Sequence, residues 1–235
     1  MEENSLNYGL LCMQSGLYEC VIPQLRAVVL NISIENKIFD IKLYYDGEIS
    51  EKVLDLWDCA ICEASSHFTY GVEQSIERLD YPIPIPLTGQ FVYWRKESVF
   101  HSELIKPIFE KKLIDSMKKM PLKIFELLPQ DFLDNIKATI KGYFLLIVQE
   151  ALLGQVEPNL REVALEWKNS FLFVHFYYDQ KISSSNEQSV ENVMKHIKSY
   201  MHPKSYLEKR VVLIAQKHKL PVHQAVVYRR YELKN

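Results

Sequence analysis

The feature that most constrains the fold of this chain is an internal repeat. Residues 15–28 (SGLYECVIPQLRAV) and 150–163 (EALLGQVEPNLREV) share six identical residues at an offset of 135. Two further pairs of blocks recur in the same order: 38–50 with 171–183 at an offset of 133, and 90–96 with 224–230 at an offset of 134. Self-similarity in a fixed order is typical of a duplicated structural unit. The sequence therefore predicts that one unit is folded twice.

Each copy has the pattern of an α-β-β-α-β-β unit. Apolar, β-branched and aromatic runs predict a hairpin followed by two more strands in each copy. The predicted strands are 26–34, 38–45, 72–80 and 90–96 in the first copy, and 161–167, 171–178, 206–215 and 224–231 in the second. One helix precedes the hairpin, and a second follows a recurring Ile-Ser pair, whose serine can cap free N–H groups. We expect an α+β fold with antiparallel sheets.

Three segments follow from this pattern: a first repeat unit (1–98), a helical connector (99–128) and a second repeat unit (129–235). The connector has an apolar stripe at helical spacing, whereas a flexible linker would be polar and rich in Gly and Ser. Pro129 suits the first turn of the helix that opens the second unit. We expect one compact pseudo-dimer within a monomeric chain.

Composition and charge exclude several classes of protein. Hydrophobic residues make up 48% and charged residues 25%, and the net charge is −2. These values exclude a generally basic nucleic-acid-binding protein and a generally acidic, disordered chain. The first residues lack the features of a signal peptide. The longest apolar run, 143–148, is far shorter than the roughly 20 residues that span a bilayer. We expect a cytoplasmic protein with reduced cysteines.

The sequence CAIC, from Cys59 to Cys62, is the most suggestive chemical motif. In redox proteins such a pair lies at a helix N-terminus, where the thiol pKa falls, but here it lies two to three turns into a predicted helix. Together with Asp55 and Asp58 the two thiols could bind a metal ion. A second CxxC or a histidine at zinc-ribbon spacing is missing, and the second copy has no thiols there. We expect small structural residues, and neither metal nor cofactor.

Other candidate catalytic groups have simpler interpretations. The repeated Tyr-Tyr-Asp that begins at Tyr44 places its tyrosines on opposite faces of a strand, so we expect structural roles for it and for Arg26 and Arg161. His218 and His223 are expected in a solvated loop. HExxH, GxSxG, GxGxxG and Walker motifs are absent from the sequence. We expect a non-enzymatic protein, with an enzyme site assembled between the copies as the less favoured alternative.

Charge is unevenly distributed along the chain. Residues 40–80 have ten acidic and three basic residues, whereas residues 195–235 have ten basic and two acidic residues. An acidic surface accelerates association with a basic partner. The predicted partner-binding residues lie on the second helix of the first copy: Glu51, Asp55, Asp58 and Glu63. Two alternatives remain: the oppositely charged faces attract each other within the chain, or the basic stretch contacts nucleic acid, which we consider unlikely.

One set of residues in the first copy forms a recognisable pattern: Val21, Pro23, Leu25, Arg26, Tyr44, Tyr45, Asp46, Gly47, Glu48, Ile49, Ser50, Arg78, Leu79, Asp80, Pro82, Pro84, Pro86, Val92, Tyr93 and Arg95. In these residues the first copy resembles a family of small bacterial immunity proteins of contact-dependent growth-inhibition toxins. The second copy is degenerate, and family members are single units, so the second copy can stand in for a homodimer mate. The resemblance implies a protein that binds and blocks a toxin domain. A structural or adaptor module without a toxin partner is the alternative.

Overall fold

The computed structural model describes residues 6–86, 88–97, 142–168, 171–203 and 205–230. The predicted connector (99–128) and Pro129 lie outside these residues. The chain divides into two compact units. Unit 1 contains Met1–Lys106, Leu152–Val156 and Arg229–Asn235, and unit 2 contains Pro107–Ala151 and Glu157–Tyr228. The boundaries of the sequence repeats remain a prediction.

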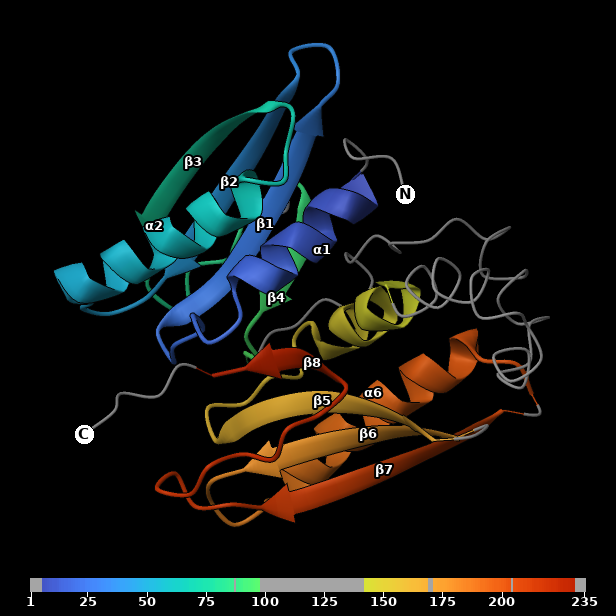
Figure 1. Ribbon diagram of the computed structural model, residues 1–235. Coiled ribbons are helices and arrows are strands. Elements are labelled where there is room, and N and C mark those ends of the chain that lie inside the picture. The colour runs from blue at the N-terminus through green and yellow to red at the C-terminus, as the bar shows by residue number, and fades with distance from the viewer. Residues whose placement is uncertain (1–5, 87, 98–141, 169–170, 204, 231–235) are drawn as a thin grey trace. The chain divides into compact units, whose positions relative to one another are not determined.

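Both units have the predicted order of elements (Figure 1). Unit 1 contains α1 (Leu6–Gly16), β1 (Leu25–Ser33), β2 (Ile38–Tyr45), α2 (Glu51–Ser65), β3 (Gly71–Arg78) and β4 (Gln90–Trp94). The second copy contains a helical segment at 142–152, then β5 (Leu160–Lys168), β6 (Phe171–Tyr178), α6 (Ser184–Tyr200), β7 (Tyr206–Leu213) and β8 (Ala225–Arg229). The α+β class and the tandem repeat are confirmed.

The two four-stranded sheets have the same strand order, β3-β2-β1-β4 and β7-β6-β5-β8. The hairpins β1–β2 and β5–β6 are antiparallel, as predicted. The expectation of wholly antiparallel sheets is wrong, because β3 pairs parallel to β2 and β7 pairs parallel to β6. The reason is the helix between the paired strands: it carries the chain back along the sheet, so the next strand starts at the same end as the previous one.

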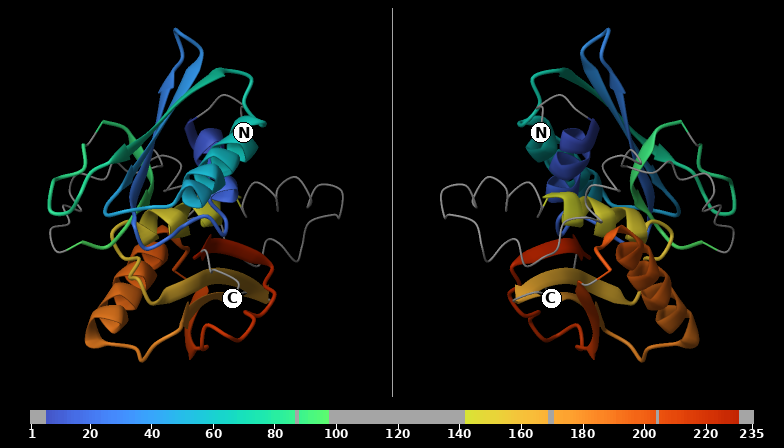
Figure 2. Two further views of the ribbon diagram at one scale, coloured as in Figure 1. Left: turned by 90° about the vertical axis from the view of Figure 1, so that its left-hand side faces the viewer. Right: turned by 90° about the vertical axis from the view of Figure 1, so that its right-hand side faces the viewer.

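One part of the core of unit 1 lies between its sheet and the two helices α1 and α2, which cover one face of the sheet (Figures 1 and 2). Phe39, Ile41 and Leu43 alternate along β2 and are fully buried, as is Trp57 of α2. A Cβ atom at Gly16 would lie 2.3 Å from the carbonyl oxygen of Ala60 in α2. Close approach of the two helices therefore requires a glycine at that position.

Short segments from the second half of the sequence complete unit 1. Leu153 is buried in a cluster with Val29 and Phe91. The N–H of Gly154 donates to the carbonyl of Trp94 at 2.9 Å. Gly154 has a positive φ of 67°, a conformation that a glycine adopts readily just after a helix, here the helix at 142–152. A sequence repeat and a compact unit are therefore not the same stretch of chain.

The repeated arginines anchor the loop between the last two strands of each unit. Arg26 is buried and donates to the carbonyls of Leu79 (2.6 Å) and Ile83 (2.9 Å). It also donates to both carboxylate oxygens of Glu97, each at 2.6 Å. Arg161 is equally buried and donates to four carbonyls: Ile214 (3.0 Å), Ala215 (3.0 Å), Gln216 (3.3 Å) and His218 (3.1 Å). Both arginines have the expected structural role.

The Tyr-Tyr-Asp sequence is also structural in unit 1. Tyr44 packs in the cluster of Val29 and Phe91 on one face of the sheet, whereas the ring of Tyr45 lies 5.7 Å from that of Trp57 on the other. Asp46 accepts two hydrogen bonds from Arg95, at 3.1 and 2.6 Å. The tyrosines therefore point to opposite faces, as their spacing predicts.

Candidate functional site

The predicted binding residues lie on the outer surface of α2. Glu51, Asp55, Asp58 and Glu63 are all exposed. The opposite side of the helix is buried against unit 1, through Trp57, Ala60, Ile61 and Ala64. This division follows from the 3.6-residue period of the helix. We call the four exposed carboxylates the acidic face.

The helix ends do not explain the charges of the acidic face. Glu51 lies in the first turn, where the helix dipole favours a carboxylate. Glu63 lies in the last turn, where the dipole disfavours it, and α2 has no basic residue in that turn. By contrast, α6 has Glu187 in its first turn and Lys198 in its last. The charge pattern of α2 is therefore not the one that helix stability alone would favour.

The N-terminal caps also favour the stability of α6 over that of α2. Ser183 accepts a hydrogen bond from the N–H of Asn186 and forms a full capping box at α6. Ser50 occupies the N-cap position of α2 without a side-chain cap hydrogen bond. The prediction of a serine cap is confirmed for α6, while Ser50 of α2 has only the position of a cap.

Other acidic residues of segment 40–80 are engaged or face elsewhere. Arg78 forms ion pairs with Glu48 and Asp80. The hydrogen bond from Arg78, helped by the N–H of Gly47, holds the pKa of Asp80 below its usual value. Glu73 and Glu77 pair with β2 residues that point away from the helices, so they lie on the other face of the sheet. The structure thus separates charges that the sequence count places together.

The acidic face has few partners within unit 1. Asp58 accepts a hydrogen bond from Gln74 at 3.2 Å. Among the described residues, none of its four carboxylates forms an ion pair within 4.0 Å. Carboxylates in this state are available to cationic groups of a partner.

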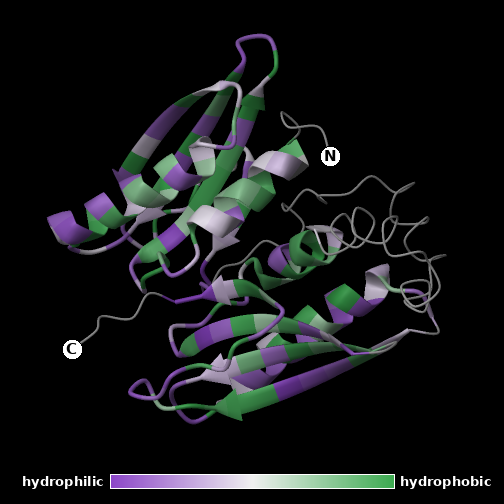
Figure 3. Cartoon of the chain, viewed as in Figure 1, coloured by the Kyte–Doolittle hydropathy of each residue, from purple (hydrophilic) through white to green (hydrophobic). Residues whose placement is uncertain are grey.

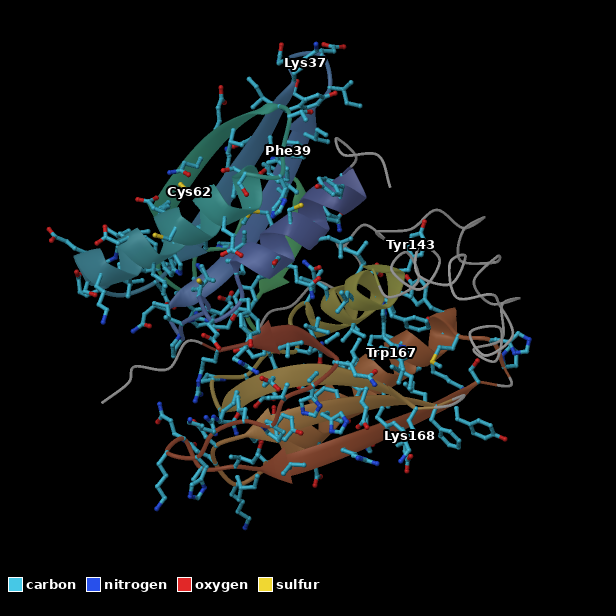
Figure 4. All side chains as sticks on the ribbon, viewed as in Figure 1. Lys37, Phe39, Cys62, Tyr143, Trp167 and Lys168 are labelled. Atoms are coloured by element: carbon cyan, nitrogen blue, oxygen red, sulfur yellow. The ribbon has the colours of Figure 1, made fainter. Side chains whose placement is uncertain are left out.

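Two cysteines of α2 lie next to residues of the acidic face in the sequence. Cys59 and Cys62 are exposed, as Figure 4 shows for Cys62 on α2, whereas Cys12 and Cys20 are buried. Burial raises the pKa of Cys20 to about 11, and the nearby carboxylates of Glu63 and Glu19 contribute. The described residues include no group of three or more metal-binding side chains. The exposed thiols are therefore distinguishable from the buried pair by reagents.

Unit 2 contains a polar cluster that sequence reasoning missed. His175 lies 3.1 Å from a carboxylate oxygen of Glu166, and the hydroxyl of Tyr177 lies 2.7 Å from Nε2 of His223. The rings of His175 and His223 lie 4.4 Å apart. The prediction of a solvated loop is therefore wrong for His223, which is half-buried, whereas His218 is exposed. No local pattern could reveal this contact, because it joins residues 46 positions apart.

Two copies of one α+β unit, one of which exposes an acidic helix, define a tandem-repeat protein with a candidate surface for a basic partner. Within that class, the chain belongs to the MafI2 immunity protein family, whose model matches residues 8–97 and 141–232. The two matched regions correspond to the two sequence repeats. A comparison with curated proteins gives no match. No helix of the described residues is both long enough and apolar enough to cross a bilayer.

Proposed function

We propose that this chain binds a toxin domain and blocks its active site, without catalysis of its own. The proposed partner is a basic toxin domain of a contact-dependent growth-inhibition system, met in the cytoplasm. Membership of an immunity protein family supports this role. The observation that carries the choice of surface is the acidic face, whose carboxylates are exposed and form no ion pair among the described residues.

The physical basis is electrostatic steering followed by steric occlusion. A cluster of like charges on a rigid helix raises the association rate of an oppositely charged partner. The buried side of α2 fixes that helix on unit 1, so little conformational entropy is lost on binding. A toxin active site that binds an anionic substrate would expose the cationic groups that the acidic face can pair with.

Charge reversal on α2 tests this proposal. The partner is first captured from native cells with the tagged chain and then purified as a toxin domain. Asp55→Lys with Asp58→Lys should reduce the association rate by about tenfold or more and weaken its dependence on salt. Stopped-flow binding and a toxin activity assay measure the two effects.

The matched control keeps the change in net charge and moves it to another surface. Glu73→Lys with Glu77→Lys reverses two exposed carboxylates on the other face of the same sheet. This variant should bind and neutralise nearly as wild type does. Equal slowing by both pairs would assign the effect to net charge, and unchanged kinetics in the α2 variant would refute the assignment of the acidic face.

Thiol footprinting gives a test without mutation. Cys59 and Cys62 lie next to residues of the acidic face in the sequence and are exposed. Bound toxin should protect both from a maleimide reagent, as mass spectrometry of the labelled peptides would show. Undiminished labelling in a saturated complex would place the toxin elsewhere. A captured partner that has no toxic activity would instead favour the adaptor alternative.

A further inference from the structure

The strand β7 is the outermost strand of its sheet. Its inner side is bonded to β6, and within the described part of the chain no strand lies on its outer side. Seven of its eight residues are exposed. Its last three residues are apolar yet solvent-accessible, with exposed fractions of 36% for Val211, 36% for Val212 and 57% for Leu213. Such an edge is an open template for another strand.

The backbone shows which groups of β7 point outward. The N–H of Ile214 donates to the carbonyl of Tyr178 in β6 at 2.8 Å. The N–H and C=O groups of successive residues point to opposite sides of a strand. The backbone groups of Arg210 and Val212 therefore also point toward β6, as those of Ile214 do. Lys209, Val211 and Leu213 therefore direct their N–H and C=O groups away from the sheet.

The equivalent edge of unit 1 is protected differently. β3 occupies the same place in its sheet as β7, and its sequence, GVEQSIER, places a polar or charged residue at most positions. In β7 the charges lie in the middle, and the strand ends in Val-Val-Leu (Figure 3). Charged residues are the usual protection of an edge strand, so the end of β7 lacks it. The edge strand β3 therefore serves as an internal control for the edge strand β7.

We propose that β7 pairs with β7 of a second copy of this chain, antiparallel and about a two-fold axis centred on Val211. In this register Val211 faces its own counterpart, Val212 faces Arg210, and Leu213 faces Lys209 of the second copy. The outward backbone groups of Lys209, Val211 and Leu213 all find partners. The two sheets join into one eight-stranded sheet.

Charge and the length of overlap select this register, and charge selects the occupant. Pairing centred on Val212 would overlap only three residues of each strand (211–213), whereas pairing centred on Val211 overlaps five (209–213). Pairing centred on Lys209 or on Arg210 would place like charges directly opposite each other, which is destabilising. Centred on Val211, each cationic side chain lies over an apolar one, which its aliphatic stem can cover. A two-fold pairing closes the β7 edge in both copies, whereas pairing β7 with the acidic β3 of another copy would leave free edges and propagate. The proposed dimer differs from the monomer expected from the sequence.

The test is the molar mass of the full chain in solution, measured by light scattering after size exclusion at several micromolar concentrations. Wild type should have twice the 27.7 kDa mass of the chain. Val212→Lys places two like-charge pairs in the interface and should shift the protein to the mass of one chain. Glu77→Lys, at the equivalent position of β3, should leave the dimer intact.

A second variant guards against misfolding. Val211→Pro removes the central outward N–H and leaves the bonds to β6 in place, a substitution that edge strands tolerate. The Val211→Pro variant should also be monomeric. The control variant, Val212→Thr, should remain dimeric. The circular dichroism spectra of both variants should match that of wild type. A wild-type monomer at every concentration, an assembly larger than two copies, or a dimer that survives both Val212→Lys and Val211→Pro would overturn the proposal.

Discussion

At the scale of single residues, buried arginines determine how the loops of each unit are held. Arg26 has an exposed fraction of 1%, and its partner Glu97 has 7%. A charge so buried is tolerated because each nitrogen of the guanidinium donates to an acceptor. The repetition of this arginine at position 161 indicated its importance, but its contacts with carbonyls of a distant loop became evident only in the structure.

Loss of Arg26 should therefore be costly. Arg26→Ala leaves the carboxylate of Glu97 buried without this partner, and we expect it to lower the free energy of unfolding by about 3–5 kcal/mol. Replacing both residues, with Arg26→Met and Glu97→Leu, should recover most of that loss, because no unpaired charge remains. Urea unfolding of the three proteins measures both effects. A double variant as unstable as Arg26→Ala would contradict this account.

His175 should make unit 2 sensitive to acid. Burial lowers its pKa, although the adjacent carboxylate of Glu166 opposes the shift and Arg210 adds to it. A histidine with a lowered pKa binds its proton more readily in the unfolded chain, where the pKa is about 6.5. The free energy of unfolding should therefore fall as the pH drops below about 6.5.

Urea unfolding between pH 8 and pH 5 tests this sign. His175→Gln should have a flatter pH profile than wild type over that range, since it removes the shifted group. His67→Gln alters an exposed histidine and should retain the wild-type profile. Identical profiles for wild type and His175→Gln would show that His175 does not cause the acid sensitivity.

At the scale of elements, α2 and α6 occupy equivalent positions in the two copies but have different charge patterns. Only α6 has a basic residue in its last turn. Glu63→Lys should therefore stabilise the protein by about 0.3–1 kcal/mol through the helix dipole, and it should weaken binding of a basic toxin. Glu187→Lys, which puts a cation in the first turn of α6, should destabilise by a similar amount. Chemical denaturation measures both changes, and a destabilised Glu63→Lys variant would argue against the interpretation.

At the scale of the whole molecule, charge is segregated along the chain although the net charge is only −2. The expected consequence is a toxin association rate that falls steeply as salt rises, while the dissociation rate changes little. Binding kinetics over a series of sodium chloride concentrations would measure this. An association rate that does not depend on salt would show that electrostatic steering does not contribute to binding, whatever the affinity of the complex.

The sequence by itself determined the elements and their duplication. Strands 38–45 and 171–178 were predicted correctly, because they depend on local periodicity and on a repeat visible in one dimension. The acidic residues of α2 were identified on the same basis, and their role as a binding site remains a prediction.

Only the tertiary structure decided how distant segments meet. The parallel pairing of β3 and β7, the contact of His223 with Tyr177 and the exposed end of β7 depend on which strands become neighbours. Local patterning cannot encode these features, because the direction of a crossover and the identity of an edge strand result from the packing of the whole sheet. The same repeated sequence can therefore predict two matching units, while the fold determines which surfaces each of them leaves exposed.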